Sequence, residues 1–484
     1  MNNQITRRNT LTAVGAAGVV ALAGCVGGDD DNGGDDTGTV TTEDTDPLVR
    51  VGTLQDITGE NGPEFAHQGL AGFLSGLAYK NGGDQPEPIP ETQNLATSIG
   101  DQFTYTVSDV GDVGDVEFEV HVRDTESDAR VAHSVADELV EEEGVDVLYG
   151  LSSSDGLERV NNIFLGERTV PLFVGQASTT NVTRDGDRCR EHLFRATANT
   201  AMNSRAGAIY IVEETDIENV AMINVPTSFG QDVVENYREI FEEADIDIVL
   251  EQEIPVALSD MDTWHQHLTE AEDRGAEAMV YGFTGITGEF FAQAFVDGNY
   301  QMEAYGQGGS RMTFREVGQA ILDFLAGAGI DEITPEIVDF LPFGPLTCRY
   351  FWNQYDNEIN DWLVDNHTEV YGVYPDLFTS SAFTSASAIV QAFEQAGEVS
   401  RDAILTEVSG MSVEATPKGE GQYEFQAYNN QARSPITVAE YQPTQEENTQ
   451  FWPASLQPSP VVRTIAKDQT TIQQENPTMT CDLS

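Results

Sequence analysis

Short hydroxyl-bearing residues gather in two loops that follow predicted strands. The run 152–154 (Ser-Ser-Ser) follows an apolar strand predicted over 145–149, and the run 177–180 (Ala-Ser-Thr-Thr) follows another, over 171–174. Hydroxyl groups and free backbone N–H groups at strand ends suit a small anion, above all a carboxylate. Ser and Thr also cap helix N-termini, which is the commoner role for any single loop. Two such loops at successive strand ends favour a binding cleft, with candidate residues Ser152, Ser153, Ala177, Ser178 and Thr179.

No arrangement typical of catalysis or metal binding stands out. The run 150–154 lacks the second glycine of a nucleophile elbow, and no P-loop or GxGxxG motif follows a strand. His265 and His267 are two residues apart on a predicted helix, so their side chains face different ways and a metal site is not expected. We therefore expect a binding protein rather than an enzyme, without a cofactor or a metal. The abundant carboxylates would nevertheless conceal a catalytic pair.

The elements that position these loops alternate between strand and helix, first over 48–174 and again after residue 198. Alternation of this length predicts an α/β fold of two doubly wound, parallel-sheet lobes, with ligands at the carboxyl ends of the strands. Residues 84–112, rich in Pro, Gln and Asp, are predicted to be an irregular surface insertion. The predicted strand-end loops cover 56–62, 151–155, 176–180, 226–230 and 284–288.

The composition is strongly acidic. The 484 residues include 82 Asp and Glu against 23 Lys and Arg, a formal net charge of −59, and 39% of the residues are hydrophobic. The hydrophobic content suffices for folded cores. The charge excludes ordinary nucleic-acid binding and argues against docking onto anionic lipid. Only Lys80, Lys418 and Lys467 are lysines. A widespread acidic excess of this kind favours a halophilic protein that self-repulsion destabilises in dilute buffer.

The N-terminus is predicted to be a targeting segment. Arg7 and Arg8 precede a short apolar run that ends in Leu-Ala-Gly and Cys25. Together these features are typical of a twin-arginine lipoprotein signal peptide over 1–25, in which Cys25 becomes lipidated. The alternative is an uncleaved anchor with an incidental cysteine. Residues 26–47 are rich in Gly, Asp and Thr, which predicts an acidic disordered tether. Either reading places the body on the extracellular face of the membrane, anchored to it.

Three further cysteines and two glycosylation sequons remain. In an exported protein, Cys189, Cys348 and Cys481 are compatible with one disulfide and one leftover thiol. Three pairings are possible, and three buried thiols are the alternative. The sequons begin at Asn181 and Asn366. We discount the first because a glycan would obstruct the neighbouring ligand loop.

Over about residues 48–440 the chain resembles the branched-chain amino acid (Leu/Ile/Val) type of periplasmic solute-binding protein of ABC transporters, a family that includes amide- and urea-binding members. The order and spacing of several stretches carry the resemblance: 51–59 with 81–83, 122–128 (VRDTESD), 149–154 (YGLSSS), 171–179 (PLFVGQAST), 193–197 (LFRAT), 220–232 (VAMINVPTSFGQD), 280–296 and 371–396.

The resemblance implies a type I periplasmic binding protein fold with a hinge of three crossings, near 198, 345 and 420. The expected lobes are 48–197 with 346–420, and 198–345 with 421–484. It implies ligand contacts from Ser152, Ala177, Ser178 and Thr179, joined in the second lobe by Phe229 and Thr284. Family members that bind amino acids place a Glu where this chain has Gly308, so an ammonium group would depend on Asp56, Glu60 or Asp155.

The resemblance also implies the partners. The expected function is capture of a small polar solute, such as a branched-chain amino acid, an amide or a urea-like molecule, for delivery to the membrane permease of an ABC importer. We expect a monomer. A tethered ligand-binding sensor is the alternative, although no membrane-spanning signalling segment follows residue 48. A secreted hydrolase is a third possibility that lacks a nucleophile motif.

Overall fold

The computed structural model describes residues 47–59 and 62–484. The predicted signal peptide, with Arg7, Arg8 and Cys25, and the predicted tether up to residue 46 therefore lie outside the described residues. So does Glu60.

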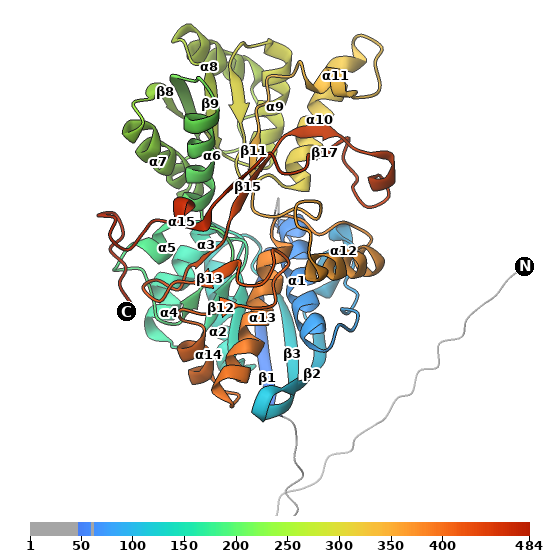
Figure 1. Cartoon of the computed structure of the whole chain (residues 1–484), viewed down its shortest axis with the longest axis vertical. Helices are drawn as coiled ribbons and strands as arrows, with labels where there is room; N and C mark the ends of the chain where they lie inside the picture. The colour runs from blue at the N-terminus through green and yellow to red at the C-terminus, as the bar shows by residue number, and fades with distance from the viewer. Residues whose placement is uncertain (1–46, 60–61) are drawn as a thin grey trace, which may run out of the picture. The chain divides into compact units, whose positions relative to one another are not determined.

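The first sheet has six strands in the order β2-β3-β1-β4-β5-β6. Figure 1 shows β3 between β1 and β2. All neighbouring pairs are parallel except β2 and β3, which are antiparallel. Its strands are β1 (Leu48–Gln55), β2 (Gln102–Val110), β3 (Gly114–Asp124), β4 (Val147–Gly150), β5 (Leu172–Val174) and β6 (Leu193–Phe194). The helices along this part of the chain are α1 (Gly62–Lys80), α2 (Ala129–Glu141), α3 (Ser154–Arg159), α4 (Leu165–Glu167) and α5 (Asn181–Arg184). We call this sheet with its helices the first lobe.

The second sheet is entirely parallel, in the order β10-β9-β7-β8. Its strands are β7 (Asn219–Asn224), β8 (Asp247–Glu253), β9 (Ala278–Gly282) and β10 (Glu303–Tyr305). The accompanying helices are α6 (Thr200–Glu214), α7 (Ser228–Glu243), α8 (Met261–Asp273), α9 (Ile286–Gly298), α10 (Arg311–Ala326) and α11 (Pro335–Val338). We call this part the second lobe. The two parallel sheets with their helices confirm the predicted α/β class.

The chain returns to the first lobe after β11 (Leu346–Cys348), through α12 (Glu358–Tyr371), α13 (Thr379–Ala396) and α14 (Arg401–Glu407). Helix α13 lies against α1 (Figure 1). The two backbones approach closely at Gly72 and Gly76, where an added Cβ would lie 2.5 Å from carbonyl oxygens of α13. This close packing fixes α1, whose N-terminal turn carries Glu64 and Phe65.

Short antiparallel strands complete the chain. They are β12 (Ser412–Val413), β13 (Tyr423–Phe425), β14 (Ala432–Arg433), β15 (Ile436–Ala439), β16 (Tyr441–Pro443), β17 (Leu456–Pro458) and β18 (Arg463–Ile465), followed by α15 (Lys467–Thr470). Gln431 forms a bridge with Arg195 beside the first sheet, whereas β15 pairs with β11 and β18. The chain therefore passes between these two environments at residues 434–435.

One predicted segment differs from the structure. Residues 102–110, expected to be irregular, form the edge strand β2. Phe103, Tyr105 and Val107 alternate along it, and the last two are buried against the core of the first lobe. The alternation is typical of a strand with one buried face. The polar, Pro-rich composition of the surrounding segment concealed it.

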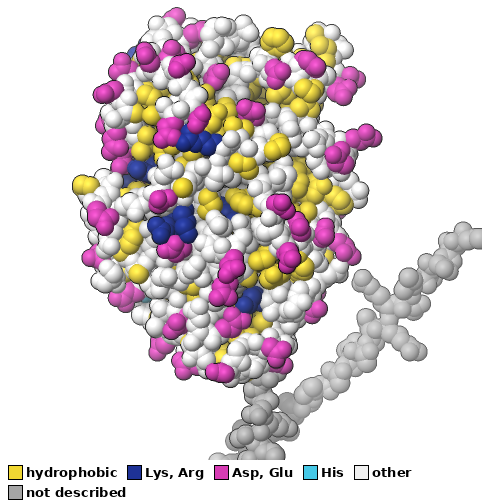
Figure 2. All heavy atoms as spheres, in the orientation of Figure 1, with side chains coloured by type: hydrophobic (Ala, Val, Ile, Leu, Met, Phe, Trp, Pro, Cys, Tyr) yellow, Lys and Arg dark blue, Asp and Glu magenta, His cyan; other side chains and the backbone are white. Residues whose placement is uncertain are grey.

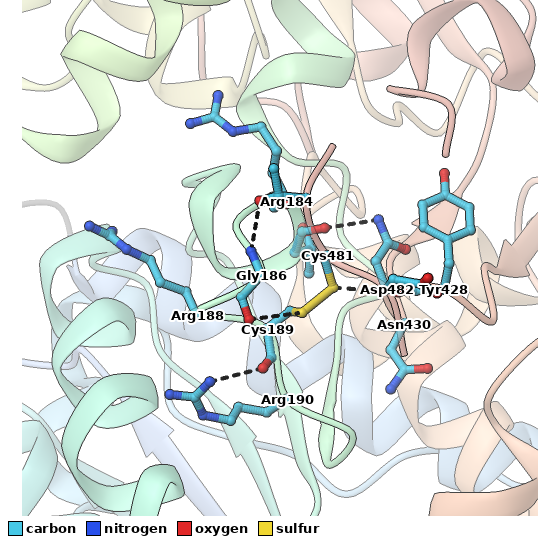
Figure 3. Close-up of a disulfide and its surroundings, with 12 residues drawn as sticks. Arg184, Gly186, Arg188, Cys189, Arg190, Tyr428, Asn430, Cys481 and Asp482 are labelled. Carbon is cyan, nitrogen blue, oxygen red and sulfur yellow. Dashed lines mark hydrogen bonds between the residues drawn. A yellow bond between two sulfur atoms is a disulfide. The ribbon is translucent and has the colours of Figure 1, made fainter. Parts of the chain in front are cut away.

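A disulfide joins Cys189 to Cys481 (Figure 3). Cys348 is a buried free thiol. The C-terminal segment is also held by its backbone, because the N–H groups of Thr480 and Cys481 both donate to the carbonyl of Arg184, at 2.9 and 2.8 Å. Of the three pairings that the sequence left open, the structure contains the one that attaches the C-terminus to the first lobe.

Acidic side chains are scattered over the surface. Figure 2 shows Asp and Glu over the whole visible face, with few Lys and Arg among them. Among the described residues, no helix is both long and apolar enough to cross a membrane.

Candidate functional site

A cavity of about 320 Å³ lies between the two lobes. All five predicted strand-end loops contribute to its lining, through residues such as Asp56, Ser152, Gln176, Thr227 and Thr284. The carboxyl ends of the parallel strands of both sheets therefore face the same cavity, as expected for doubly wound sheets.

Five of the seven residues predicted to bind ligand line this cavity: Ser152, Ser153, Ser178, Phe229 and Thr284. Their hydroxyl groups are not equally free. Ser153 accepts a hydrogen bond from the N–H of Gly156 at 3.2 Å and so caps α3, the alternative role that the sequence had left open. Ser152 donates to Oε1 of Gln176 at 3.0 Å, and Gln176 in turn donates to the carbonyl of Phe65 at 2.9 Å.

The other two predicted residues, Ala177 and Thr179, are not part of the lining. Ala177 is 1% exposed and packs in the core beside α2 and α3. Thr179 is fully buried, and its hydroxyl faces Glu158 at 3.3 Å. Its N–H donates to Ser154 at 3.2 Å, and its carbonyl accepts from Arg195 at 2.6 Å. The hydrogen bonds of Thr179 therefore hold the loop 176–180 in place from the side away from the cavity. Its neighbour Ser178 lines the cavity.

The apolar part of the lining is rich in aromatic rings. Phe65 and Phe378 come from the first lobe, and Phe229 and Phe283 from the second. The rings of Phe65 and Phe378 meet edge to face, with centroids 5.0 Å apart. Four phenylalanines around one small space favour a ligand with an apolar, flat body.

Among the described residues, Arg349 is the one cation of the lining. It follows β11 directly, and its guanidinium lies over the ring of Phe378, 5.3 Å from the centroid. Asn203, with its amide oriented so that the oxygen faces the guanidinium, accepts from Nε and Nη2 at 2.6 and 2.7 Å. Burial lowers the pKa of Arg349 to about 9.

Two buried N–H donors of the lining have no hydrogen-bond partner among the described residues: Nη1 of Arg349 and Nε2 of Gln307. Gly308, which follows Gln307 and also lines the cavity, is the position where the resemblance led us to expect a Glu. A Cβ added to Gly308 would lie 3.7 Å from Nε of Arg349. A side chain there would therefore lie in van der Waals contact with the guanidinium.

Two carboxylates of the described chain line the cavity. Asp56 is 3% exposed and accepts a hydrogen bond from the hydroxyl of Thr125; burial raises its pKa. Asp155 is exposed and accepts from Ser228 at 2.7 Å. Both are therefore engaged by hydroxyl groups of the protein. No group of three or more His, Cys, Asp or Glu within 47–59 and 62–484 could hold a metal.

Polar contacts join the lobes around this cavity. Ser228 of α7 reaches Asp155 of α3, and Asp232 of α7 accepts from the N–H and hydroxyl of Thr180 at 2.7 and 2.8 Å. Each contact pairs a donor from one lobe with an acceptor from the other. In this structure the two lobes are therefore in direct contact beside the cavity.

Sequence reasoning missed Arg349, Gln307 and Phe378. They reach the cavity from the hinge region, from the segment before α10 and from the start of α13, so no local motif connects them. A usable signal existed for Arg349, because an arginine directly after the apolar strand 346–348 is unusual in a chain with so few cations.

Comparison with solved structures shows the same architecture. A periplasmic binding protein from Burkholderia mallei is similar with a TM-score of 0.67 at 13% identity, over 90% of this chain and 99% of that one. An ABC-type branched-chain amino acid transporter protein from Rhodopseudomonas palustris has a TM-score of 0.62 at 20% identity, over 88% and 99% of the chains. A solute-binding protein of an ABC transporter from Rhodopseudomonas palustris, in complex with 3,4-dihydroxybenzoic acid, has a TM-score of 0.64 at 15% identity, over 87% and 98%.

No curated protein matches the sequence. A family model described as periplasmic binding protein matches residues 48–447, which include every residue of the cavity lining named above. The chain belongs to this family of periplasmic binding proteins.

Proposed function

We propose that the protein captures a small solute outside the cell membrane and delivers it to the permease of an ABC importer. The observation that carries this proposal is the cavity between the lobes. Residues of both lobes line it, and polar contacts join the lobes beside it. A ligand held by both lobes stabilises their closed arrangement through contacts that neither lobe offers alone. A closed form that depends on ligand is the signal an importer needs. This role requires binding and release but no chemical turnover.

The ligand belongs to the small molecules that fit a cavity of about 320 Å³. The sequence favoured a branched-chain amino acid, an amide or a urea-like solute, and left a carboxylate open. Two of the similar structures are described as a branched-chain amino acid transporter protein and as a complex with 3,4-dihydroxybenzoic acid. Amino acids and aromatic acids are therefore the first two classes to compare.

A ligand screen by thermal shift, in molar KCl, tests the binding role. The panel contains amino acids, amides, urea and small aliphatic and aromatic carboxylates, and each positive is titrated by calorimetry. We expect one chemical class to raise the melting temperature and to reduce the radius of gyration in X-ray scattering. In cells, deletion of the protein should abolish uptake of the same compound. Absence of a stabilising compound, or unchanged uptake, would contradict the proposal.

The proposed anchoring is tested separately, because it concerns residues outside the described part of the chain. Cys25→Ser should release the protein or leave it as an uncleaved precursor, and replacement of Arg7 and Arg8 by Lys should block export. Cell fractionation and mass spectrometry of the N-terminus measure both effects. Normal processing and membrane retention of the Cys25→Ser variant would contradict lipid anchoring.

A further inference from the structure

Arg349 is a buried cation without an anionic partner among the described residues. It is 6% exposed, and none of the ion pairs of the described chain includes it. Asn203 satisfies Nε and Nη2, but Nη1 has no acceptor. A buried charge normally has a counter-charge or a full set of hydrogen bonds, because desolvation is costly.

A second buried arginine shows what a purely structural guanidinium looks like in this protein. Arg195 is fully buried, and all three of its side-chain nitrogens donate to protein acceptors: Gln431, the carbonyl of Thr179, and Thr183. Arg195 does not line the cavity, whereas Arg349 does. The incomplete set of partners thus occurs at the arginine that a ligand can reach.

The neighbouring charges make the need for an anion greater. Burial and the charge of Arg349 disfavour the protonated forms of Arg195 and Lys418, whereas the charge of Asp232 favours that of Arg195. Lys418 donates only to neutral oxygens, of Ser434 and Pro435, at 3.0 and 2.8 Å. Arg349 therefore lies near two other buried basic side chains, of which Arg195 has Asp232 as a nearby anion.

Resting on the function proposed above, we propose that the cavity takes a small aromatic monocarboxylate without an ammonium group, and that Arg349 and Gln307 hold its carboxylate. Each of these residues lines the cavity and has a buried N–H without an acceptor among the described residues. The rings of Phe65, Phe229 and Phe378 enclose the apolar body of the ligand. Asp56 and Asp155 each already accept a hydrogen bond from a protein hydroxyl, of Thr125 and Ser228, so an ammonium group would have to share these acceptors.

The test compares three probes of similar shape by calorimetric titration in molar KCl: benzoate, benzamide and phenylalanine. Benzamide has the same ring without the negative charge, and phenylalanine adds an ammonium. We expect benzoate to bind at least about 100-fold more tightly than benzamide, since charge-assisted hydrogen bonds to a buried cation would be lost. Phenylalanine should bind more weakly than benzoate.

Arg349→Gln should remove the preference for benzoate over benzamide, and Arg349→Lys should retain only part of it because lysine cannot form the planar fork. Arg238→Gln, which alters a surface ion pair of α7, is the matched control and should retain the preference. If Arg349→Gln does not fold, Gln307→Ala tests the same carboxylate site and should reduce the preference about tenfold.

The outcomes separate this inference from the proposed function. Equal or tighter binding of benzamide or phenylalanine by the unaltered protein would overturn the carboxylate assignment while leaving a solute-binding protein. If Arg349→Gln still prefers benzoate over benzamide, the carboxylate binds elsewhere. If Arg349→Gln does not fold, an unchanged preference in Gln307→Ala leads to the same conclusion. Failure of all three probes, with a different compound active in the wider screen, would also overturn the ligand class alone. Failure of every compound would contradict the proposed function itself.

Discussion

Glu64 of the first lobe accepts a hydrogen bond from Arg311 of the second, with 2.8 Å between Oε1 and Nε. Both side chains are buried, and Arg311 also donates its backbone N–H to Asp376 at 2.8 Å. The pair joins the start of α1 to the start of α10, next to the cavity-lining residues Phe65 and Met312. It therefore connects the two lobes directly beside the proposed ligand.

Glu64→Gln should weaken ligand binding about ten- to a hundredfold, because it removes a buried charge that favours the closed arrangement. Titration with the ligand found in the screen measures this change, and X-ray scattering should show a more open average form. Glu394→Gln is the control, since Glu394 pairs with Lys80 within the first lobe at 2.8 Å. Equal losses of affinity in both variants would contradict a role in closure.

The Ser178 and Thr179 pair gives a sharp test of the cavity. Ser178→Ala should weaken binding by roughly threefold to tenfold, since Ser178 lines the cavity and its hydroxyl is available to a ligand there. Thr179→Ala should leave the affinity unchanged, because that hydroxyl faces Glu158. Phe229→Ala should weaken binding more than either by removing part of the apolar wall. A larger loss for Thr179→Ala than for Ser178→Ala, by titration, would show that the ligand occupies a different space.

The contrast between these two neighbours marks the limit of what the sequence predicts. Strand periodicity and loop composition predicted the two parallel sheets and placed polar loops at their carboxyl ends, because those features depend on local pattern. Which of two adjacent residues lines the cavity depends on the backbone dihedral angles within a tight loop, and composition does not encode these angles. Arg349 and Gln307 were missed for a different reason: their meeting depends on how the hinge segments pass between the lobes, a long-range property.

The disulfide should contribute to stability mainly by restricting the unfolded chain. It closes a loop of 292 residues, and loss of a native disulfide typically costs about 2–5 kcal/mol. Cys481→Ser should therefore lower the unfolding free energy and abolish the effect of a reducing agent on the melting temperature. Cys348→Ala is the control, because that buried thiol forms no disulfide and should preserve sensitivity to the reductant. Reductant sensitivity that persists in Cys481→Ser would contradict the pairing.

Two buried histidines should make the protein sensitive to acid. Burial, together with a smaller effect of the charge of Arg311, lowers the pKa values of His67 and His367 to about 3. Because both pKa values lie below the unfolded value of about 6.5, the unfolded chain binds more protons than the folded chain between about pH 3 and 6.5. This contribution is complete above pH 6.5 and declines by about 1.4 kcal/mol per pH unit for each histidine as the pH falls towards 3.

His67→Phe keeps a ring against Tyr371 and removes one of these titrating groups. The variant should resemble the unaltered protein at pH 7.5 and show a shallower loss of stability between pH 6.5 and 4. Denaturant unfolding at a series of pH values measures the slope of the unfolding free energy against pH for the variant and for the unaltered protein. Parallel slopes would show that His67 does not contribute to the acid sensitivity.

The net charge of −59 should make folding dependent on salt. Carboxylates dispersed over the surface repel one another more strongly in the compact state than in the expanded one (Figure 2). Because the screening length falls from about 30 Å at 0.01 M salt to about 3 Å at 1 M, KCl should raise the melting temperature steeply over this range. Sucrose at equal osmolality is the control, since it favours compact states without screening charge. A melting temperature that is constant from dilute buffer to molar KCl, or that sucrose raises equally, would exclude charge repulsion as the cause and remove the basis for a halophilic origin.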